Sequence, residues 1–122
     1  MSKISQFFKK HVHHTDHPLI YHYISPPEDA RNYRLHLRME SDGSGLLILN
    51  GSTILHLNQT AAEYAYCLVK NMPTEKAVDH ITRRYHVSRA QASQDYDTFC
   101  QRIQTLVLST DLDPITFLDY ER

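Results

Sequence analysis

The 122-residue chain has no surplus of either charge and contains very little glycine. Lysine and arginine number 13 and aspartate and glutamate 14, which gives a net charge of −1 with neutral histidines. Proteins built mainly to hold nucleic acid or an anionic membrane need a basic surplus, so neither class is favoured. With three glycines in total, the chain has no glycine-rich loop of the kind that binds phosphate groups.

Long hydrophobic runs and a signal-peptide pattern are also missing. No apolar run approaches the roughly 18 residues that cross a membrane. Near the N-terminus, Ile4, Phe7 and Phe8 are followed by lysines and histidines instead of a hydrophobic segment. We therefore expect a cytoplasmic protein that does not act on a membrane.

Residue types that carry chemistry are few and scattered. The sequence has no activated nucleophile, no paired carboxylates with an obvious partner and no metal-ligand spacing, so we expect neither an enzyme nor a cofactor. Asp95 and Arg102 are interpreted as surface charges of a helix. Cys67 and Cys100 fall on apolar helix faces, where a free cysteine behaves as a small hydrophobe. A disulfide or a reactive thiol is the alternative.

A histidine-rich patch lies near the N-terminus. Its members are His11, His13, His14, His17 and His22. Such a patch can bind a metal, but His11 and His13 do not share a helix face and only Asp16 supports them nearby. We favour a solvated segment that responds to pH near 6.

The strand pattern centres on two short β-prone runs joined by Asn50-Gly51. This dipeptide predicts a type I′ hairpin, because both central residues of that turn need positive φ. Residues 33–40 alternate apolar and polar side chains with period two, which predicts a half-buried strand before the hairpin. Together the runs predict a three-stranded antiparallel meander. Residues 19–25 are also strand-like and end at Pro26-Pro27.

Three helices are expected after the hairpin. Their predicted bounds are residues 61–70, 75–85 and 89–108. The expected N-terminal caps are Thr60 with Glu63, Thr74, and Ser88 with Gln91. The first cap would lock the hairpin and the first helix into one geometry. In the third helix, Ala92, Tyr96 and Phe99 begin an apolar stripe that predicts core packing.

This order of elements predicts an α+β fold that is winged-helix-like, with a three-stranded antiparallel sheet followed by three helices. We divide the chain into an N-terminal extension (1–32) with a short helix and a possible extra strand, one domain (33–108) and a C-terminal tail (109–122). The tail is more apolar than a disordered segment should be, because it contains Ile115, Phe117, Leu118 and Tyr120. They favour docking on the domain, in a groove or on a partner chain.

Three segments of the domain resemble the PqqD family. Residues 57–62 (LNQTAA), preceded by a short hairpin, resemble the L-N-x-T-A entry of that family. Residues 77–87 (AVDHITRRYHV) resemble its v-x-x-I-x-x-x-y-x-v segment, and residues 95–99 (DYDTF) are similar to its D-v-x-x-F. The chain departs from the pattern where Asn71-Met72-Pro73 replaces a glycine near the end of the first helix.

The resemblance implies a RiPP recognition element, a peptide chaperone that binds the leader of a ribosomally made precursor peptide. It implies that the leader is presented to a modifying enzyme, often a radical SAM protein. In such domains the leader adds as a strand to the outer edge of the third strand and lies against the third helix. The implied peptide-binding residues here are Ser52, Thr53, Ile54, Leu55, His56, Gln91, Asp95, Thr98 and Arg102.

Two other functions stay open. A winged-helix nucleic-acid binder shares the fold class, but the third helix balances Arg89 and Arg102 against Asp95 and Asp97. An assembly or structural subunit, such as a homodimer, would pair its edge strand with another copy. A vacant edge is needed for peptide binding, and residues 19–25 or the tail could cap it.

Overall fold

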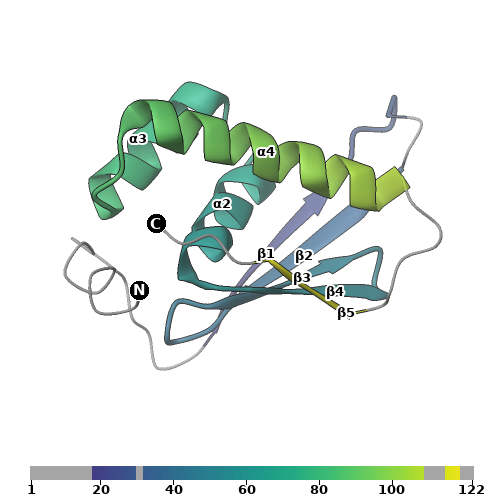
Figure 1. Cartoon of the computed structure of the whole chain (residues 1–122). Helices are drawn as coiled ribbons and strands as arrows, with labels where there is room; N and C mark the ends of the chain where they lie inside the picture. Colours follow the sequence, from purple (N-terminus) through teal and green to yellow (C-terminus); the bar gives the residue numbers. More distant parts are fainter. Residues whose placement is uncertain (1–17, 30–31, 109–114, 119–122) are drawn as a thin grey trace.

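The computed structural model describes residues 18–29, 32–108 and 115–118. Four strands come first, then three helices, then a last short strand (Figure 1). The strands are β1 (Leu19–Ile24), β2 (Arg34–Met39), β3 (Gly45–Leu49), β4 (Thr53–Leu57) and β5 (Ile115–Leu118). The helices are α2 (Gln59–Val69), α3 (Thr74–Arg84) and α4 (Arg89–Leu108). The α+β class is confirmed, and all three predicted helices lie within two residues of their expected bounds.

The strand count differs from the expected three. The sheet has the spatial order β1-β2-β3-β4-β5, in which β1 to β4 are antiparallel and β5 is parallel to β4. Both added strands come from segments that flank residues 33–108. Residues 19–24 pair with β2 at one side of the meander, and residues 115–118 pair with β4 at the other.

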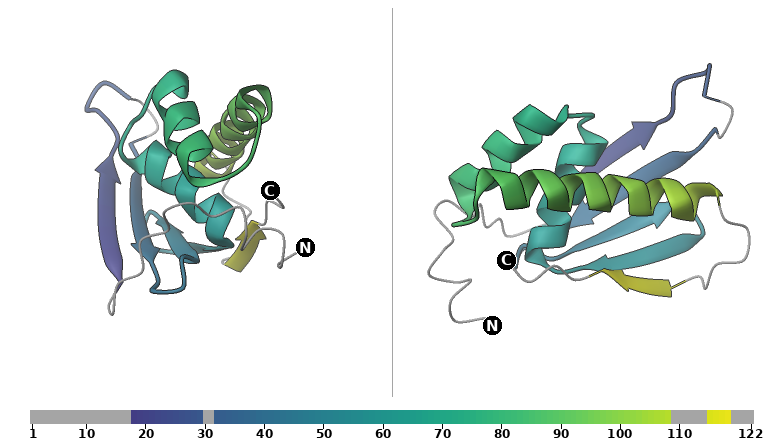
Figure 2. Two further views of the ribbon diagram at one scale, coloured as in Figure 1. Left: turned by 90° about the vertical axis from the view of Figure 1, so that its left-hand side faces the viewer. Right: turned by 45° about the horizontal axis from the view of Figure 1, so that its top comes forward.

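All three helices cover the same face of the sheet (Figures 1 and 2). Side chains alternate across a strand, so one face of each strand of the meander supplies the core. The buried positions of that face are Leu35, Leu37, Leu47, Leu49, Leu55 and Leu57. No element in the described part of the chain covers the opposite face.

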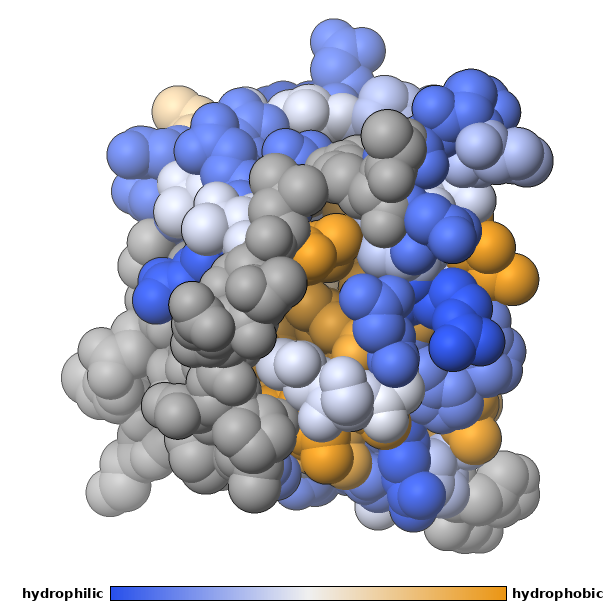
Figure 3. Space-filling model, turned by 90° about the vertical axis from the view of Figure 1, so that its right-hand side faces the viewer, coloured by the Kyte–Doolittle hydropathy of each residue, from blue (hydrophilic) through white to orange (hydrophobic). Residues whose placement is uncertain are grey.

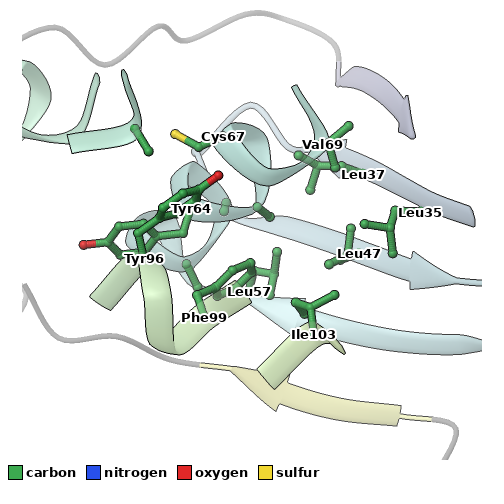
Figure 4. Packing of buried hydrophobic residues seen from close by; sticks show 14 of the residues in the cluster. Leu35, Leu37, Leu47, Leu57, Tyr64, Cys67, Val69, Tyr96, Phe99 and Ile103 are labelled. Atoms are coloured by element: carbon green, nitrogen blue, oxygen red, sulfur yellow. The ribbon is translucent and has the colours of Figure 1, made fainter. Parts of the chain in front are cut away.

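The predicted stripe of α4 completes the core. Phe99 and Ile103 point from α4 toward the leucines of the sheet, while Tyr64 of α2 lies beside Tyr96 (Figure 4). Tyr64, Phe99 and Ile103 are among the largest fully buried side chains of the described residues. The spacing of apolar residues in the sequence therefore correctly predicted which face of α4 points into the core.

The hairpin turn forms as expected at Asn50-Gly51. Both residues have positive φ, 53° and 77°, and the amide of Ser52 closes the turn on the Leu49 carbonyl at 3.1 Å. Asn50 also reaches β2, because its side-chain Oδ1 accepts from the Arg34 amide at 2.9 Å. The turn thus joins three strands instead of two.

The cap of α2 is not the predicted capping box. Asn58 caps the helix, since its Oδ1 accepts from the Ala61 amide at 2.9 Å, and Thr60 is buried within the first turn. The Glu63 carboxylate turns toward α3, where Oε1 lies 2.8 Å from His80 Nε2. A tertiary partner for Glu63 has replaced the local one that the spacing suggested.

The other helix ends follow local chemistry. Asn71 takes φ 57° after the C-cap of α2, and the Met72 amide donates to the Cys67 carbonyl at 2.9 Å. Asparagine therefore fills the left-handed position that glycine most often takes. Thr74 does not cap α3: Pro73 stands at the N-cap without a side-chain bond. Ser88 does cap α4, through its Oγ and the Gln91 amide at 3.0 Å.

We predict that Asn58→Ala lowers the free energy of unfolding by about 1 kcal/mol, because an N-terminal amide of α2 loses its acceptor. Asn58→Asp keeps an acceptor oxygen and is the matched control, with a much smaller change. Urea unfolding followed by circular dichroism measures both. Equal losses in the two variants would contradict the assignment of Asn58 as the cap.

Candidate functional site

The candidate site is the outer edge of β4, the third strand of the meander. Of the five residues predicted for this edge, Thr53, Ile54, Leu55 and His56 lie in β4, and Ser52 lies in the turn before it. On one side β4 pairs with β3, with Leu55 opposite Leu47. On the other side it pairs with β5, with Ile54 opposite Ile115 and Leu57 opposite Leu118.

The two faces of β4 have different environments. Leu55 and Leu57 point into the core, and Leu55 has no exposed surface. Ile54 and His56 alternate with them and are half-buried on the face away from the helices. A strand added to this edge would therefore contact β4 mainly through main-chain groups, as in β-augmentation.

The helix residues predicted for the site divide into two pairs. Thr98 and Arg102 are exposed on α4, whereas Gln91 is half-buried and Asp95 is only 4% exposed. On a 3.6-residue helix all four lie on one flank of the core stripe. The other flank carries Asp97, whose carboxylate Oδ1 accepts from the Thr74 hydroxyl of α3 at 3.3 Å.

The interpretation of Asp95 as a surface charge is wrong. Its Oδ2 accepts from the buried Tyr64 hydroxyl of α2 at 3.3 Å, and its Oδ1 accepts from Gln91 Nε2 at 2.9 Å. Position on a helix flank did not reveal this, because the Tyr64 hydroxyl comes from another helix. Asp95 therefore links α4 to α2. Arg102 lies about two helical turns further along α4.

We predict that Asp95→Ala lowers the free energy of unfolding by about 1–3 kcal/mol, because a buried hydroxyl and an amide lose their acceptor. Thr98→Ala, on the same flank but exposed, should stay within about 0.5 kcal/mol of the wild type. Urea unfolding at neutral pH measures both. A stable Asp95→Ala variant would indicate that this carboxyl is available to a ligand instead.

Sequence patterns missed a second polar cluster between α2 and α3. The side chains of Glu63 and His80 are both nearly buried and lie 2.8 Å apart, with Arg84 Nε 3.9 Å from the same Glu63 oxygen. The ring of Tyr66 lies 5.2 Å from that of His80. The spacing of Glu63 behind Thr60 favoured a cap, so no local signal indicated this contact. The cluster joins the two helices.

The opposite edge of the sheet is formed by β1. No strand pairs with its outer side in the described part of the chain. Its exposed face carries two large hydrophobic side chains, Ile20 at 52% and Ile24 at 70% exposure. Between them, the His22 and His36 rings meet with their Nδ1 atoms 3.1 Å apart.

The remaining histidines of the predicted patch lie outside the described residues. Those are His11, His13, His14 and His17. Within the described residues, no group of three or more His, Cys, Asp or Glu side chains is placed to hold a metal ion. His22 and His36 therefore form a pair without a third ligand of these types in that part of the chain.

The two cysteines are free thiols. Cys67 is buried in the core and Cys100 is half-buried on α4. Burial raises the pKa of both thiols, that of Cys100 to about 11. Thiolate is the reactive form, so a raised pKa disfavours a nucleophilic role at neutral pH. The prediction of small hydrophobic cysteines agrees with these positions.

Basic side chains near α4 already face acidic partners. Arg89 Nη1 lies 2.8 Å from Asp79 Oδ1, and Arg84 lies beside the Glu63 carboxylate. Arg83 donates through Nε to the Asp79 carbonyl at 3.1 Å. A phosphate group that binds these side chains would have to compete with these contacts.

Hydrophobic side chains gather in a hollow at the end of the molecule where α4 finishes (Figure 3). Leu106 and Val107, from the last turns of α4, are half-buried hydrophobics packed against the core. The hollow is bordered by polar side chains in that view. In the described residues, no helix has the length and apolar character needed to cross a membrane.

Comparisons of the chain with protein-family models, with curated proteins and with solved structures found no match.

Proposed function

We propose that the protein is a non-catalytic peptide-binding module that holds a peptide on the outer edge of β4. The observation that carries this proposal is the pairing of β4 with β5. A segment remote in sequence adds there as a strand, in register from Ile54 opposite Ile115 to Leu57 opposite Leu118. An edge that accepts one extended segment has the main-chain geometry to accept another.

The partners in this proposal are the leader of a ribosomally made precursor peptide and its modifying enzyme, such as a radical SAM protein. They come from the resemblance of residues 33–108 to the PqqD family. The description of the domain as winged-helix-like belongs to the same proposal. Its support is the order of an antiparallel run of strands, β1 to β4, followed by three helices.

The exposed flank of α4 supplies the side-chain contacts in this proposal. Of the four predicted helix residues, Thr98 and Arg102 are the exposed ones. Helix α4 lies on the same side of the molecule as β4 and β5 (Figure 2). Gln91 and Asp95 position this flank by bonding to each other and to Tyr64. Main-chain pairing would give affinity, and the flank would give selectivity.

We predict that a synthetic leader, taken from a small precursor gene next to this one, shifts the amide NMR signals of residues 53–57 and 91–102. Arg102→Ala should weaken binding about 3- to 10-fold, since it removes one exposed polar contact worth about 1 kcal/mol. Gln104→Ala changes an exposed residue of the same helix outside the predicted stripe and is the control.

A scrambled leader of the same composition distinguishes sequence-specific binding from nonspecific binding. Shifts confined to the β1 edge, or absent at saturating peptide, would contradict the proposed site. A neighbouring gene for a maturation enzyme would support the proposed partner, and its absence would favour the second candidate.

The β1 edge favours assembly as that second candidate. β1 reads LIYHYI, with no charged residue and no proline, although natural edge strands usually carry such protection. Ile20 and Ile24 add exposed apolar surface beside the side of β1 that pairs with no other described strand. A second copy that pairs β1 with β1 would cover both the main-chain groups and this surface.

If assembly occurs, sedimentation over a range of concentrations should reveal a dimer that Ile24→Lys abolishes, because a charge would be buried at the new interface. Thr98→Lys adds the same charge on exposed α4 and should leave the dimer intact. A monomer at every concentration would contradict this candidate without affecting the peptide-binding proposal.

A further inference from the structure

We propose that β5 is a built-in competitor for the β4 edge, so that a peptide ligand binds only when it displaces residues 115–118. This inference rests on the proposed function of that edge and adds its regulation. The chain's own strand occupies the main-chain groups that a ligand would use. The edge is thus closed in the free protein, and ligand affinity includes the free energy of opening it.

The geometry of β5 makes it the most replaceable strand of the sheet. It pairs over four residues, whereas β1 and β2 have six residues each and β3 and β4 have five. Its pairing is parallel, which is slightly less stable per residue than the antiparallel pairing elsewhere. Among the described elements, β5 packs extensively against β4 alone.

The rest of the domain has its own supports. The buried side chains of the meander and of α2, α3 and α4 form one cluster that extends from Tyr33 to Ile103. Asp95 of α4 accepts from the Tyr64 hydroxyl of α2, and Glu63 of α2 lies 2.8 Å from His80 of α3. Departure of β5 would expose one side of β4 and leave these contacts in place.

Covalent attachment explains how so short a strand can hold the edge. An intrachain segment acts at an effective concentration that free peptide must exceed or outbind. When the edge is vacant in about 1–10% of molecules, the apparent affinity for a competing peptide falls about 10- to 100-fold. The ligand class that follows is a β-prone apolar segment like ITFL, longer or better matched than β5 itself.

The test compares three states of the 122-residue chain. His56→Cys/Phe117→Cys places a disulfide across directly paired residues, because adjacent strands lie about 4.8 Å apart and a disulfide spans about 4.4–6.8 Å between Cα atoms. Thr116→Pro/Phe117→Pro removes two successive backbone N–H donors, one of which must face β4. The wild type is the third state, and each single cysteine variant is a control.

The probe is a fluorescent synthetic peptide of residues 112–120 (LDPITFLDY), the chain's own sequence around β5. We expect the proline variant to bind it about 10- to 100-fold more tightly than the wild type. The oxidised cysteine variant should bind none, and reduction should restore its affinity to that of the single cysteine variants. Hydrogen exchange of the amides of residues 54–57, without peptide, should be fastest in the proline variant and slowest in the oxidised one.

The two readouts separate the inference from the function beneath it. If the amides of residues 54–57 are equally protected from hydrogen exchange in all three states, the inference is overturned, whether or not the probe peptide binds. Graded protection with no binding of probe or leader by the opened variant would contradict the peptide-binding function, while β5 still closes the edge. A disulfide that joins two chains instead of one would overturn the intrachain competitor and assign β5 to a second copy.

Discussion

The structure depends on the main-chain ladder of β4, which is bonded on both sides. Through β3 it belongs to the meander that forms the core, and through β5 it is paired with the end of the chain. An unpaired strand edge leaves amides and carbonyls that attract another strand. At the β4 edge, on the side where α4 lies, the chain's own β5 pairs with these main-chain groups. At the β1 edge, no strand of the described residues pairs with them.

Two buried polar contacts set the positions of the helices over this sheet. Asp95 accepts from the Tyr64 hydroxyl and from Gln91 Nε2, and Glu63 lies near both His80 and Arg84. Buried polar groups need such partners, so each contact restricts how the helices can pack. Their effect on function is indirect. They hold the exposed flank of α4 at a fixed place, where Thr98 and Arg102 remain accessible.

The two edges of the sheet present different chemistry to a partner. The β4 edge borders the helical layer and is filled by a short parallel strand. The β1 edge borders exposed isoleucines and a pair of histidine rings. Peptide capture and self-assembly therefore draw on separate surfaces, and one protein can be tested for each without disturbing the other.

Features that depend on residues close together in the chain could be predicted from local sequence patterns. Asn50-Gly51 specified the turn, period-two alternation specified the inward leucines of β2, and the spacing of Tyr96, Phe99 and Ile103 specified the inward face of α4. These signals are local because turns, strand faces and helix stripes repeat over a few residues. The α+β order followed from them.

Contacts between groups far apart in the chain depend on how the whole domain packs. Glu63 has a local partner in a capping box and a better one on α3, and sequence spacing registers only the first. Asp95 looks like surface from its helix position and is buried by Tyr64 from another helix. The pairing of β5 with β4 joins segments separated by all three helices. Closing such long loops depends on the whole packed domain, so no local pattern determined that the predicted binding edge is occupied by the chain itself.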